Sequence, residues 1–232
     1  MIRHAIYLHG FASSPGSSKA EYFARELAAR GVGFSCPDFN EPDFESLTVT
    51  RMLEQTRQAI ETSLRADDAS AGQADQPTDR PIALIGSSLG AFVAVHAATQ
   101  SWAEAVGRLV LLAPALDFGG NRLRQLGEYG IEEWRRSGRL RVFHYARNEP
   151  RDVSFALYED AARYDAFEVR LSVPTLVFQG TRDASVDPKM VERWASLQPR
   201  VTLRLLDDEH QLTDSIETIW TETERFLGIA PH

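Results

Sequence analysis

The residues with the clearest chemical potential form a Gly-x-Ser-x-Gly motif, Gly86-Ser87-Ser88-Leu89-Gly90. Apolar runs at 82–85 and 91–95 flank it, so the motif falls where a strand would give way to a helix. Such a tight turn holds its central serine in a strained conformation with the hydroxyl exposed, and only very small flanking residues fit there. Ser87 is also hydroxylic but lies off the centre of the motif. We therefore predict that Ser88 is a nucleophile for acyl chemistry.

A serine nucleophile needs a base to take its proton, and that base needs a carboxylate to orient it. Asp183 follows the apolar run 176–179, and His210 follows the apolar run 203–206. Because the carboxyl ends of parallel strands meet at one edge of a sheet, we expect both side chains to lie near Ser88. The sequence therefore predicts a Ser-His-Asp catalytic triad.

Several other residues offer alternatives, each with a structural explanation. Asp187 is a second candidate for the orienting carboxylate, although its position before Pro188 is typical of a helix N-cap. His96 follows the serine motif by two helical turns and is interpreted as a packed or half-exposed helix residue. His144 is interpreted as structural, with contact to a substrate as the alternative.

Short apolar runs alternate with amphipathic segments along the chain. The predicted strands are 5–8, 32–36, 82–86, 108–113, 175–179 and 201–206, and the predicted helices are 20–29, 46–64, 89–100, 123–137, 188–196 and 214–226. Strands followed by helices indicate parallel βαβ units, and continuous apolar strands indicate a sheet covered on both faces. The predicted fold class is α/β: a single domain over residues 1–232, with a mostly parallel sheet of about six strands and helices on both faces.

One region is longer than a crossover requires. About sixty residues separate the strand ending near Ala113 from the strand starting near Thr175. We expect residues of about 117–172 to form a small cap or lid over the site, with a hairpin made by 140–145 and 153–158. Eight arginines and four glutamates lie between Arg122 and Arg151. They predict either a receptor for an anionic group or a solvated helix face with internal ion pairs.

Composition excludes several classes of function. The net charge of −8 disfavours nucleic acid and anionic membranes, and no apolar run approaches the roughly 20 residues that a membrane span needs. A single cysteine rules out an intrachain disulfide, and no His/Asp/Glu spacing or phosphate-binding motif indicates a metal or cofactor. Residues 66–80 are polar and are predicted to be a loop. The N-terminus is typical of a strand rather than a signal peptide, so we expect a cytoplasmic protein that needs no cofactor.

Over essentially its whole length the chain resembles the α/β-hydrolase superfamily. The motifs that carry this resemblance are His9-Gly10-Phe11, the serine motif, Gly180-Thr181-Arg182-Asp183 and Glu209-His210. The segment 7–15, with Ser18-Lys19-Ala20 close behind, is more specifically similar to compact bacterial esterases of the YqiA type and to acyl-protein thioesterases. The resemblance implies an oxyanion hole formed by the backbone N–H groups of Phe11 and Leu89. The order Ser, Asp, His along the chain is also that of the superfamily.

The predicted activity is hydrolysis of carboxylic esters or thioesters of small to medium acyl groups through an acyl-enzyme. His9 and Gly10 are expected to shape the loop that presents Phe11, with His9 acting through hydrogen bonds rather than proton transfer. A haloalkane dehalogenase is disfavoured because it would need aspartate in place of Ser88. A peptidase, a carbon–carbon bond hydrolase and a non-catalytic binding protein remain alternatives, and the sequence leaves the oligomeric state open.

Overall fold

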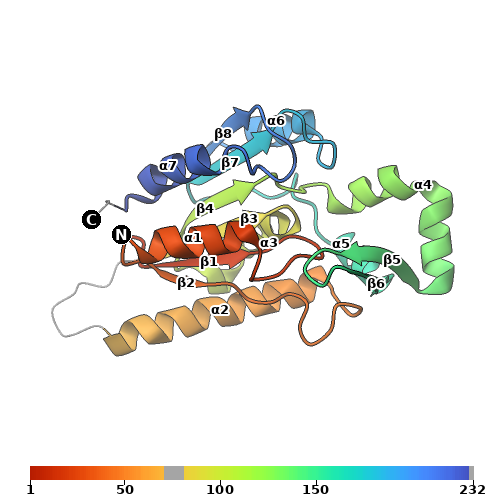
Figure 1. The fold of residues 1–232 in the computed structure, drawn as a ribbon, viewed down its shortest axis with the longest axis horizontal. Coiled ribbons are helices and arrows are strands. Elements are labelled where there is room, and N and C mark those ends of the chain that lie inside the picture. The colour runs from red at the N-terminus through yellow and green to blue at the C-terminus, as the bar shows by residue number, and fades with distance from the viewer. Residues whose placement is uncertain (71–80, 230–232) are drawn as a thin grey trace.

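Apolar runs of the sequence form a six-stranded parallel sheet in a computed structural model that describes residues 1–70 and 81–229 (Figure 1). The strand order is β2-β1-β3-β4-β7-β8. The strands are β1 (His4–Leu8), β2 (Gly33–Ser35), β3 (Ile82–Ser87), β4 (Val106–Leu112), β7 (Thr175–Gly180) and β8 (Val201–Leu206). Each adjacent pair is parallel. The sheet confirms the predicted α/β class with about six mostly parallel strands.

Helices cover both faces of this sheet. They are α1 (Ser18–Ala28), α2 (Val49–Ser70), α3 (Leu89–Ala97), α4 (Phe118–Ser137), α5 (Ala156–Ala161), α6 (Pro188–Ser196) and α7 (Ile216–Leu227), with a short 3-10 helix at Ser101–Ala103. Successive residues of β1 point to opposite faces, so Ile6 and Leu8 join the core under α2 and α3, whereas Tyr7 joins the core under α1 and α7. This two-sided packing confirms the expected layers. Among the described residues, no helix combines the length and apolar character that crossing a membrane requires.

The strand register aligns the carboxyl ends of four strands at one edge. Leu8 of β1 pairs with Gly86 of β3, and Gly180 of β7 pairs with Leu206 of β8. A Cβ atom on Gly180 would lie 2.5 Å from the carbonyl oxygen of Asp208, so glycine lets the loop after β8 pack against the end of β7. The loops after these strands therefore converge on the same edge of the sheet.

The first part of the chain between β4 and β7 lies beyond the carboxyl ends of the strands (Figure 1). It contains α4, the antiparallel strands β5 (Arg139–His144) and β6 (Glu149–Ser154), and α5. Asp117 caps α4 by accepting a hydrogen bond from Gly120 N, and the helix is kinked at Gly127, whose φ is +67°. The hairpin was expected, but its second strand lies at Glu149–Ser154 rather than 153–158. Residues 156–158 are helical instead, because Leu157 and Ala161 lie four positions apart on one buried helix face.

Helix α2 also differs from its prediction at both ends. It begins after Thr48, whose hydroxyl accepts a hydrogen bond from Arg51 N, and it continues to Ser70 instead of ending near Leu64. The polar composition after Leu64 suggested a loop. However, a solvated helix needs only good helix formers and pairs such as Arg65 with Glu61. The rest of the predicted loop, 71–80, lies outside the described residues.

Candidate active site

Ser88 occupies the turn between β3 and α3 with a positive φ of 53° and ψ of −113°. This backbone conformation is rare for a residue with a side chain. Neighbouring glycines make the turn sterically possible: a Cβ atom on Gly86 would lie 2.5 Å from Ala91 Cα, and one on Gly90 would lie 1.9 Å from Leu8 O. The Ser88 N–H donates to Leu112 O at 2.9 Å. The turn is thus tightly held with the serine at its apex.

The structure brings Ser88, His210 and Asp183 together from three separate loops. His210 Nε2 lies 3.1 Å from Ser88 Oγ, and His210 Nδ1 lies 2.8 Å from Asp183 Oδ2. An ionised carboxylate only accepts hydrogen bonds, so His210 carries its proton on Nδ1 and presents a lone pair on Nε2 to the serine hydroxyl. This arrangement can remove the proton from Ser88 Oγ as the oxygen attacks an electrophile.

Asp183 is completely buried at its side chain and accepts four hydrogen bonds. Its Oδ1 accepts the N–H groups of Ser185 and Val186, each at 2.8 Å, and its Oδ2 accepts Gln179 Nε2 at 2.9 Å beside the bond from His210. Burial on its own raises the pKa of a carboxyl, but these donors outweigh it and hold the pKa of Asp183 below its usual value. Asp183 is therefore kept as a carboxylate.

Asp187, the alternative carboxylate, lies elsewhere and has a different task. Its side chain accepts the Lys189 N–H at 3.0 Å and caps the first turn of α6. Pro188 occupies the first helical position after it, as the sequence suggested. The geometry therefore gives the contact with His210 to Asp183 and the cap to Asp187.

The loop after β1 approaches Ser88 closely. A Cβ atom on Gly10 would lie 3.3 Å from Ser87 O and 3.4 Å from Ser88 Cβ, so this position leaves little room for a side chain. Phe11 and Leu89 both line the cavity beside Ser88. Leu89 is the first residue of α3, where a backbone N–H has no acceptor within the helix. The two residues expected to form an oxyanion hole thus lie at the same cavity as Ser88.

His9 is buried beneath this loop and acts through fixed hydrogen bonds. Its Nε2 accepts the Phe39 N–H at 2.9 Å, so Nδ1 carries the proton and donates it to Gly10 O at 2.9 Å. Asp38 Oδ1 is a more distant neighbour of Nε2, at 3.4 Å. Both ring nitrogens of His9 are thus engaged at shorter range in hydrogen bonds to backbone groups.

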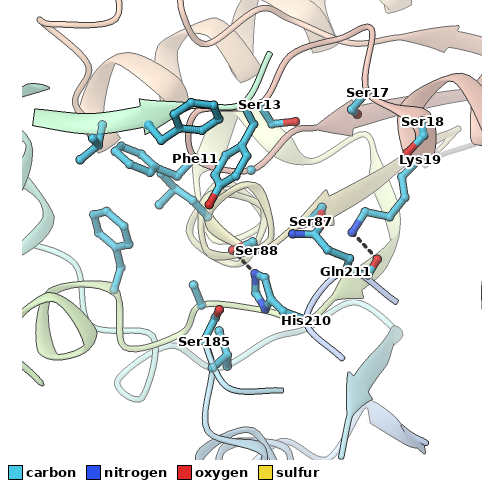
Figure 2. A pocket seen from close by; sticks show the side chains of 18 of the residues that line it. Phe11, Ser13, Ser17, Ser18, Lys19, Ser87, Ser88, Ser185, His210 and Gln211 are labelled. Atoms are coloured by element: carbon cyan, nitrogen blue, oxygen red, sulfur yellow. Dashed lines mark hydrogen bonds between the residues drawn. The ribbon is translucent and has the colours of Figure 1, made fainter. Parts of the chain in front are cut away.

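A cavity of about 490 Å³ opens at Ser88 and His210 (Figure 2). Apolar side chains line one part of it, namely Phe11, Leu89, Ala115, Phe118, Val142, Phe143, Tyr145 and Val186. Polar side chains also line it, among them Ser13, Ser17, Ser18, Lys19, Ser87, Gln125, Ser185 and Gln211, and Figure 2 shows Ser17, Ser18, Lys19 and Gln211 together on one side of it. Val142 and Phe143 come from β5, so the chain between β4 and β7 contributes to the wall. The cavity can accept a ligand with one apolar and one polar portion.

Lys19 was missed as a site residue by the sequence reasoning. It stands in the first turn of α1, and its ammonium reaches the loop that carries His210, donating to Gln211 O at 2.7 Å. Two signals were available: Lys19 is one of only two lysines in a chain whose other basic residues are arginines, and it lies in the segment Ser18-Lys19-Ala20 that accompanies the resemblance to YqiA-type esterases. Neither signal places the side chain in space, which is why only the fold reveals Lys19 at the cavity.

The other histidines singled out in the sequence lie away from the cavity. His96 is buried on α3 against the rings of Phe92 and Tyr164, and burial lowers its pKa to about 4. His144 is fully buried and bonds to Asn40. Neither lines the cavity. Among residues 1–70 and 81–229, no three His, Cys, Asp or Glu side chains gather in a way that could hold a metal ion.

Four arginines of α4, β5 and β6 pair with local carboxylates. The pairs are Arg135 with Glu132, Arg136 with Glu133, Arg141 with Asp152, and Arg151 with Glu149. None of these arginines lines the cavity. For the described side chains, this favours the internal ion pairs over the anion receptor among the two interpretations of the sequence.

Comparisons with known proteins agree with this architecture. The model of the uncharacterised protein family UPF0227 matches residues 4–226. No curated protein matches the sequence. The fold is similar to a protein of Agrobacterium vitis S4 provisionally named a hydrolase, with a TM-score of 0.78 at 23% identity over 98% of this chain and 88% of that one.

Two further structures are similar in the same way. The α/β hydrolase domain-containing protein 10 from mouse has a TM-score of 0.72 at 20% identity, over 98% of this chain and 90% of its own. Est1E from Butyrivibrio proteoclasticus has a TM-score of 0.75 at 16% identity, over 97% of this chain and 87% of its own. These likenesses confirm the predicted α/β-hydrolase fold.

Proposed function

Because this chain belongs to the uncharacterised protein family UPF0227 and has the α/β-hydrolase fold, we propose that it is a serine hydrolase of carboxylic esters or thioesters with small to medium acyl groups. The observation that carries the proposal is the unbroken chain of hydrogen bonds from Ser88 through His210 to Asp183 at the edge of a cavity. The similar structure of Est1E has also been determined with ferulic acid bound to that protein. Small carboxylic acyl groups are therefore the substrates we propose to test first.

The proposed reaction proceeds through an acyl-enzyme. Ser88 Oγ attacks the carbonyl carbon while His210 Nε2 takes the hydroxyl proton, and Asp183 stabilises the resulting imidazolium. The backbone N–H groups of Phe11 and Leu89 stabilise the negative oxygen of the tetrahedral intermediate, a contribution of about 3–4 kcal/mol per donor. His210 then gives its proton to the leaving alcohol or thiol as the carbon–oxygen or carbon–sulfur bond breaks.

Deacylation repeats these steps with water. His210 takes a proton from a water molecule whose oxygen attacks the acyl carbon of the Ser88 ester, and a second tetrahedral intermediate forms. Its collapse breaks the bond to Ser88 Oγ, which receives the proton from His210, and the carboxylic acid leaves. The cycle uses only water and the substrate, and it returns the three side chains to their starting protonation states.

We further propose that residues of about 117–172 are a cap on a single hydrolase domain spanning 1–232. Phe118, Val142 and Phe143 from this segment line the cavity, which supports a role in holding the acyl group. Burial of an apolar acyl chain against these side chains would supply roughly 0.8 kcal/mol per methylene. The length of acyl chain that the cavity prefers is thus the quantity to measure.

The test is hydrolysis of p-nitrophenyl esters from acetate to palmitate, together with labelling by a fluorophosphonate. Ser88→Ala is expected to lower kcat by at least about a thousand-fold and to abolish labelling, because no other nucleophile accepts the acyl group. Its thermal unfolding temperature should be unchanged, because alanine and serine are about equally strained at the positive φ of this position. The variant Ser87→Ala, which removes the adjacent hydroxyl, should still be labelled. Labelling retained in Ser88→Ala would overturn the assignment, and labelling without turnover of esters would favour a peptidase or carbon–carbon bond hydrolase.

A further inference from the structure

Lys19 presents an incompletely paired ammonium to the cavity that contains Ser88. Its Nζ donates to Gln211 O at 2.7 Å, which is the only hydrogen-bond acceptor recorded for it among the described residues. An ammonium has three donors, so two remain for a ligand. Figure 2 shows the side chain extending from the first turn of α1 toward the loop of His210 and Gln211. The amine therefore has donors available at the edge of the site.

The described residues that line the cavity carry a net positive charge, which favours an anionic ligand. Among the described residues that line it, Lys19 is the only lysine or arginine, and none is an aspartate or glutamate. This is notable in a chain with a net charge of −8. A half-buried cation without an ion-pair partner is costly, and an anionic ligand would offset that cost. The lining is thus complementary to a negatively charged group.

The nearest carboxylates are already committed to other donors. Asp208 Oδ1 accepts Glu209 N at 2.7 Å and its Oδ2 accepts Ser215 N at 2.9 Å, while Asp183 is occupied by His210 and backbone groups. Burial lowers the pKa of Lys19 to about 8, and the charges of Asp208 and Asp183 oppose this shift. At neutral pH the amine of Lys19 is thus still charged, and no carboxylate of the described residues forms an ion pair with it.

The polar and apolar portions of the lining indicate how a substrate would be oriented. Ser13, Ser17 and Ser18 line the cavity with Lys19 and add neutral hydroxyl groups, whereas Phe11 belongs to the apolar portion. In Figure 2, Ser88 lies between Phe11 and Lys19. An ester whose carbonyl reaches Ser88 therefore directs one end toward the aromatic rings and the other toward the ammonium.

We propose that Lys19 binds an anionic group of the substrate, and that the preferred substrates are small esters or thioesters carrying a carboxylate away from the scissile bond. This inference rests on the proposed hydrolase function. It makes Lys19 a determinant of specificity, because the ammonium contacts a part of the substrate that does not react.

The experiment compares esters that differ only by exchange of a methyl group for a carboxylate. One arm places the carboxylate on the acyl side, with mono-p-nitrophenyl glutarate against p-nitrophenyl pentanoate. A second arm places it on the leaving group, with the pentanoyl ester of 4-hydroxybenzoate against that of 4-methylphenol. The quantity measured in each arm is the ratio of kcat/KM for the anionic ester to kcat/KM for the neutral one. The arm that responds identifies the side of the ester that Lys19 contacts.

Lys19→Met is expected to lower this ratio by at least about ten-fold in one arm, mainly through a higher KM for the anionic ester. Lys19→Arg restores a positive charge and should retain part of the ratio. Lys189→Met, which removes the other lysine at an exposed position on α6, should leave the ratio unchanged. If Lys19→Met slows both esters equally in both arms, Lys19 only holds the Gln211 loop and the proposal is wrong.

A binding measurement separates failure of this inference from failure of the proposed function. If the wild-type protein hydrolyses no ester, the hydrolase assignment fails. Binding of monomethyl glutarate to the Ser88→Ala protein is then measured by calorimetry, with and without Lys19→Met. A Kd at least about ten-fold weaker in the double variant supports the anion site. Equal Kd values, or no binding to either protein, overturn it.

Discussion

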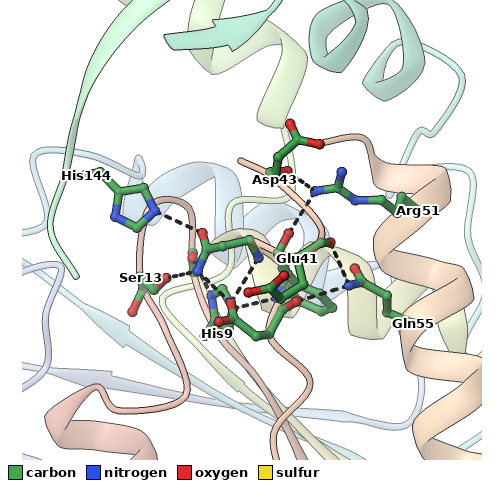
Figure 3. Close-up of polar contacts among 11 residues, drawn as sticks. His9, Ser13, Glu41, Asp43, Arg51, Gln55 and His144 are labelled. Atoms are coloured by element: carbon green, nitrogen blue, oxygen red, sulfur yellow. Dashed lines mark hydrogen bonds and ion pairs between the residues drawn. The ribbon is translucent and has the colours of Figure 1, made fainter. Parts of the chain in front are cut away.

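His144 Nε2 donates a hydrogen bond of 3.0 Å to Asn40 Oδ1, and this bond joins β5 to the loop between β2 and α2 (Figure 3). The amide of Asn40 donates to Ser13 O at 2.8 Å and to Asp38 Oδ1 at 2.6 Å, which identifies Oδ1 as the acceptor. Ser13 belongs to the loop after β1, and Asp38 lies 3.4 Å from His9. One asparagine thus connects the proposed cap with the loop that carries Phe11.

Replacing this asparagine should destabilise the protein. Asn40→Ala removes three hydrogen bonds and leaves His144 Nε2 without its acceptor in a site from which water is excluded, at an expected cost of about 2–4 kcal/mol in the free energy of unfolding. Unfolding in urea measures the change. His144→Leu and the double variant complete a thermodynamic cycle, in which the two substitutions should be coupled by about 1 kcal/mol or more. Strict additivity would mean that the bond contributes nothing to stability.

Asp183→Asn should leave the protein folded but impair the reaction. The amide offers a donor where His210 Nδ1 needs an acceptor, so the ring is expected to adopt the tautomer with its proton on Nε2 and lose its capacity as a base. A loss of about 10³–10⁴ in kcat on p-nitrophenyl esters is expected.

Asp187→Asn is the matched control for this substitution. Asparagine also caps helices, so α6 should persist and the activity should stay within about two-fold of wild type. A larger loss in Asp187→Asn than in Asp183→Asn would transfer the orienting role to Asp187.

Gly90 should tolerate no side chain. A Cβ atom there would lie 1.9 Å from the carbonyl oxygen of Leu8, which belongs to the backbone of β1, a strand held between β2 and β3 with no room to move. We expect Gly90→Ala to lose more than about 3 kcal/mol of stability or to fail to fold. Gly119→Ala serves as control, because a Cβ atom at Gly119 meets nothing within 4 Å and alanine favours the α4 helix. Thermal unfolding of the two variants distinguishes the steric effect from a general effect of replacing glycine.

The clustering of the candidate residues was predictable where strands end. Ser88, Asp183 and His210 each follow an apolar run, and a parallel sheet necessarily brings such positions to one edge. The contact between Lys19 and Gln211 was not predictable in this way, because it joins residues 192 positions apart and the donor comes from a helix. The bond between His144 and Asn40 spans 104 positions and depends on where the hairpin of β5 and β6 packs.

Boundaries in the region between β4 and β7 were also less predictable. Residues 153–158 contain β-favouring Val153 and Phe155, which suggested a strand to residue 158. Tertiary packing overrides this strand propensity. Leu157 is buried because the chain forms α5 there and packs near α2, and local propensity carries no information about that contact. Element type is thus visible in the sequence where an apolar pattern is long, and it is ambiguous where a short segment changes from strand to helix.

His96 should make the stability of the protein depend on pH in mildly acidic solution. Burial lowers its pKa from 6.5 to about 4, and Nε2 has no hydrogen-bond partner among the described residues. Between these values the unfolded chain binds a proton that the folded chain does not, so stability falls as the pH is lowered. The loss begins below about pH 6.5 and reaches on the order of 3 kcal/mol near pH 4.

Urea unfolding of the wild-type protein and of His96→Leu between pH 4 and 8 measures this contribution. Leucine does not titrate, so the difference in unfolding free energy between the two proteins should be constant above pH 6.5. Below pH 6.5 it should shift progressively in favour of the variant, because only the wild-type chain gains a protonated histidine on unfolding. Parallel curves across the whole range would show that His96 titrates alike in the folded and unfolded chain, and burial against Phe92 and Tyr164 would then not exclude its charged form.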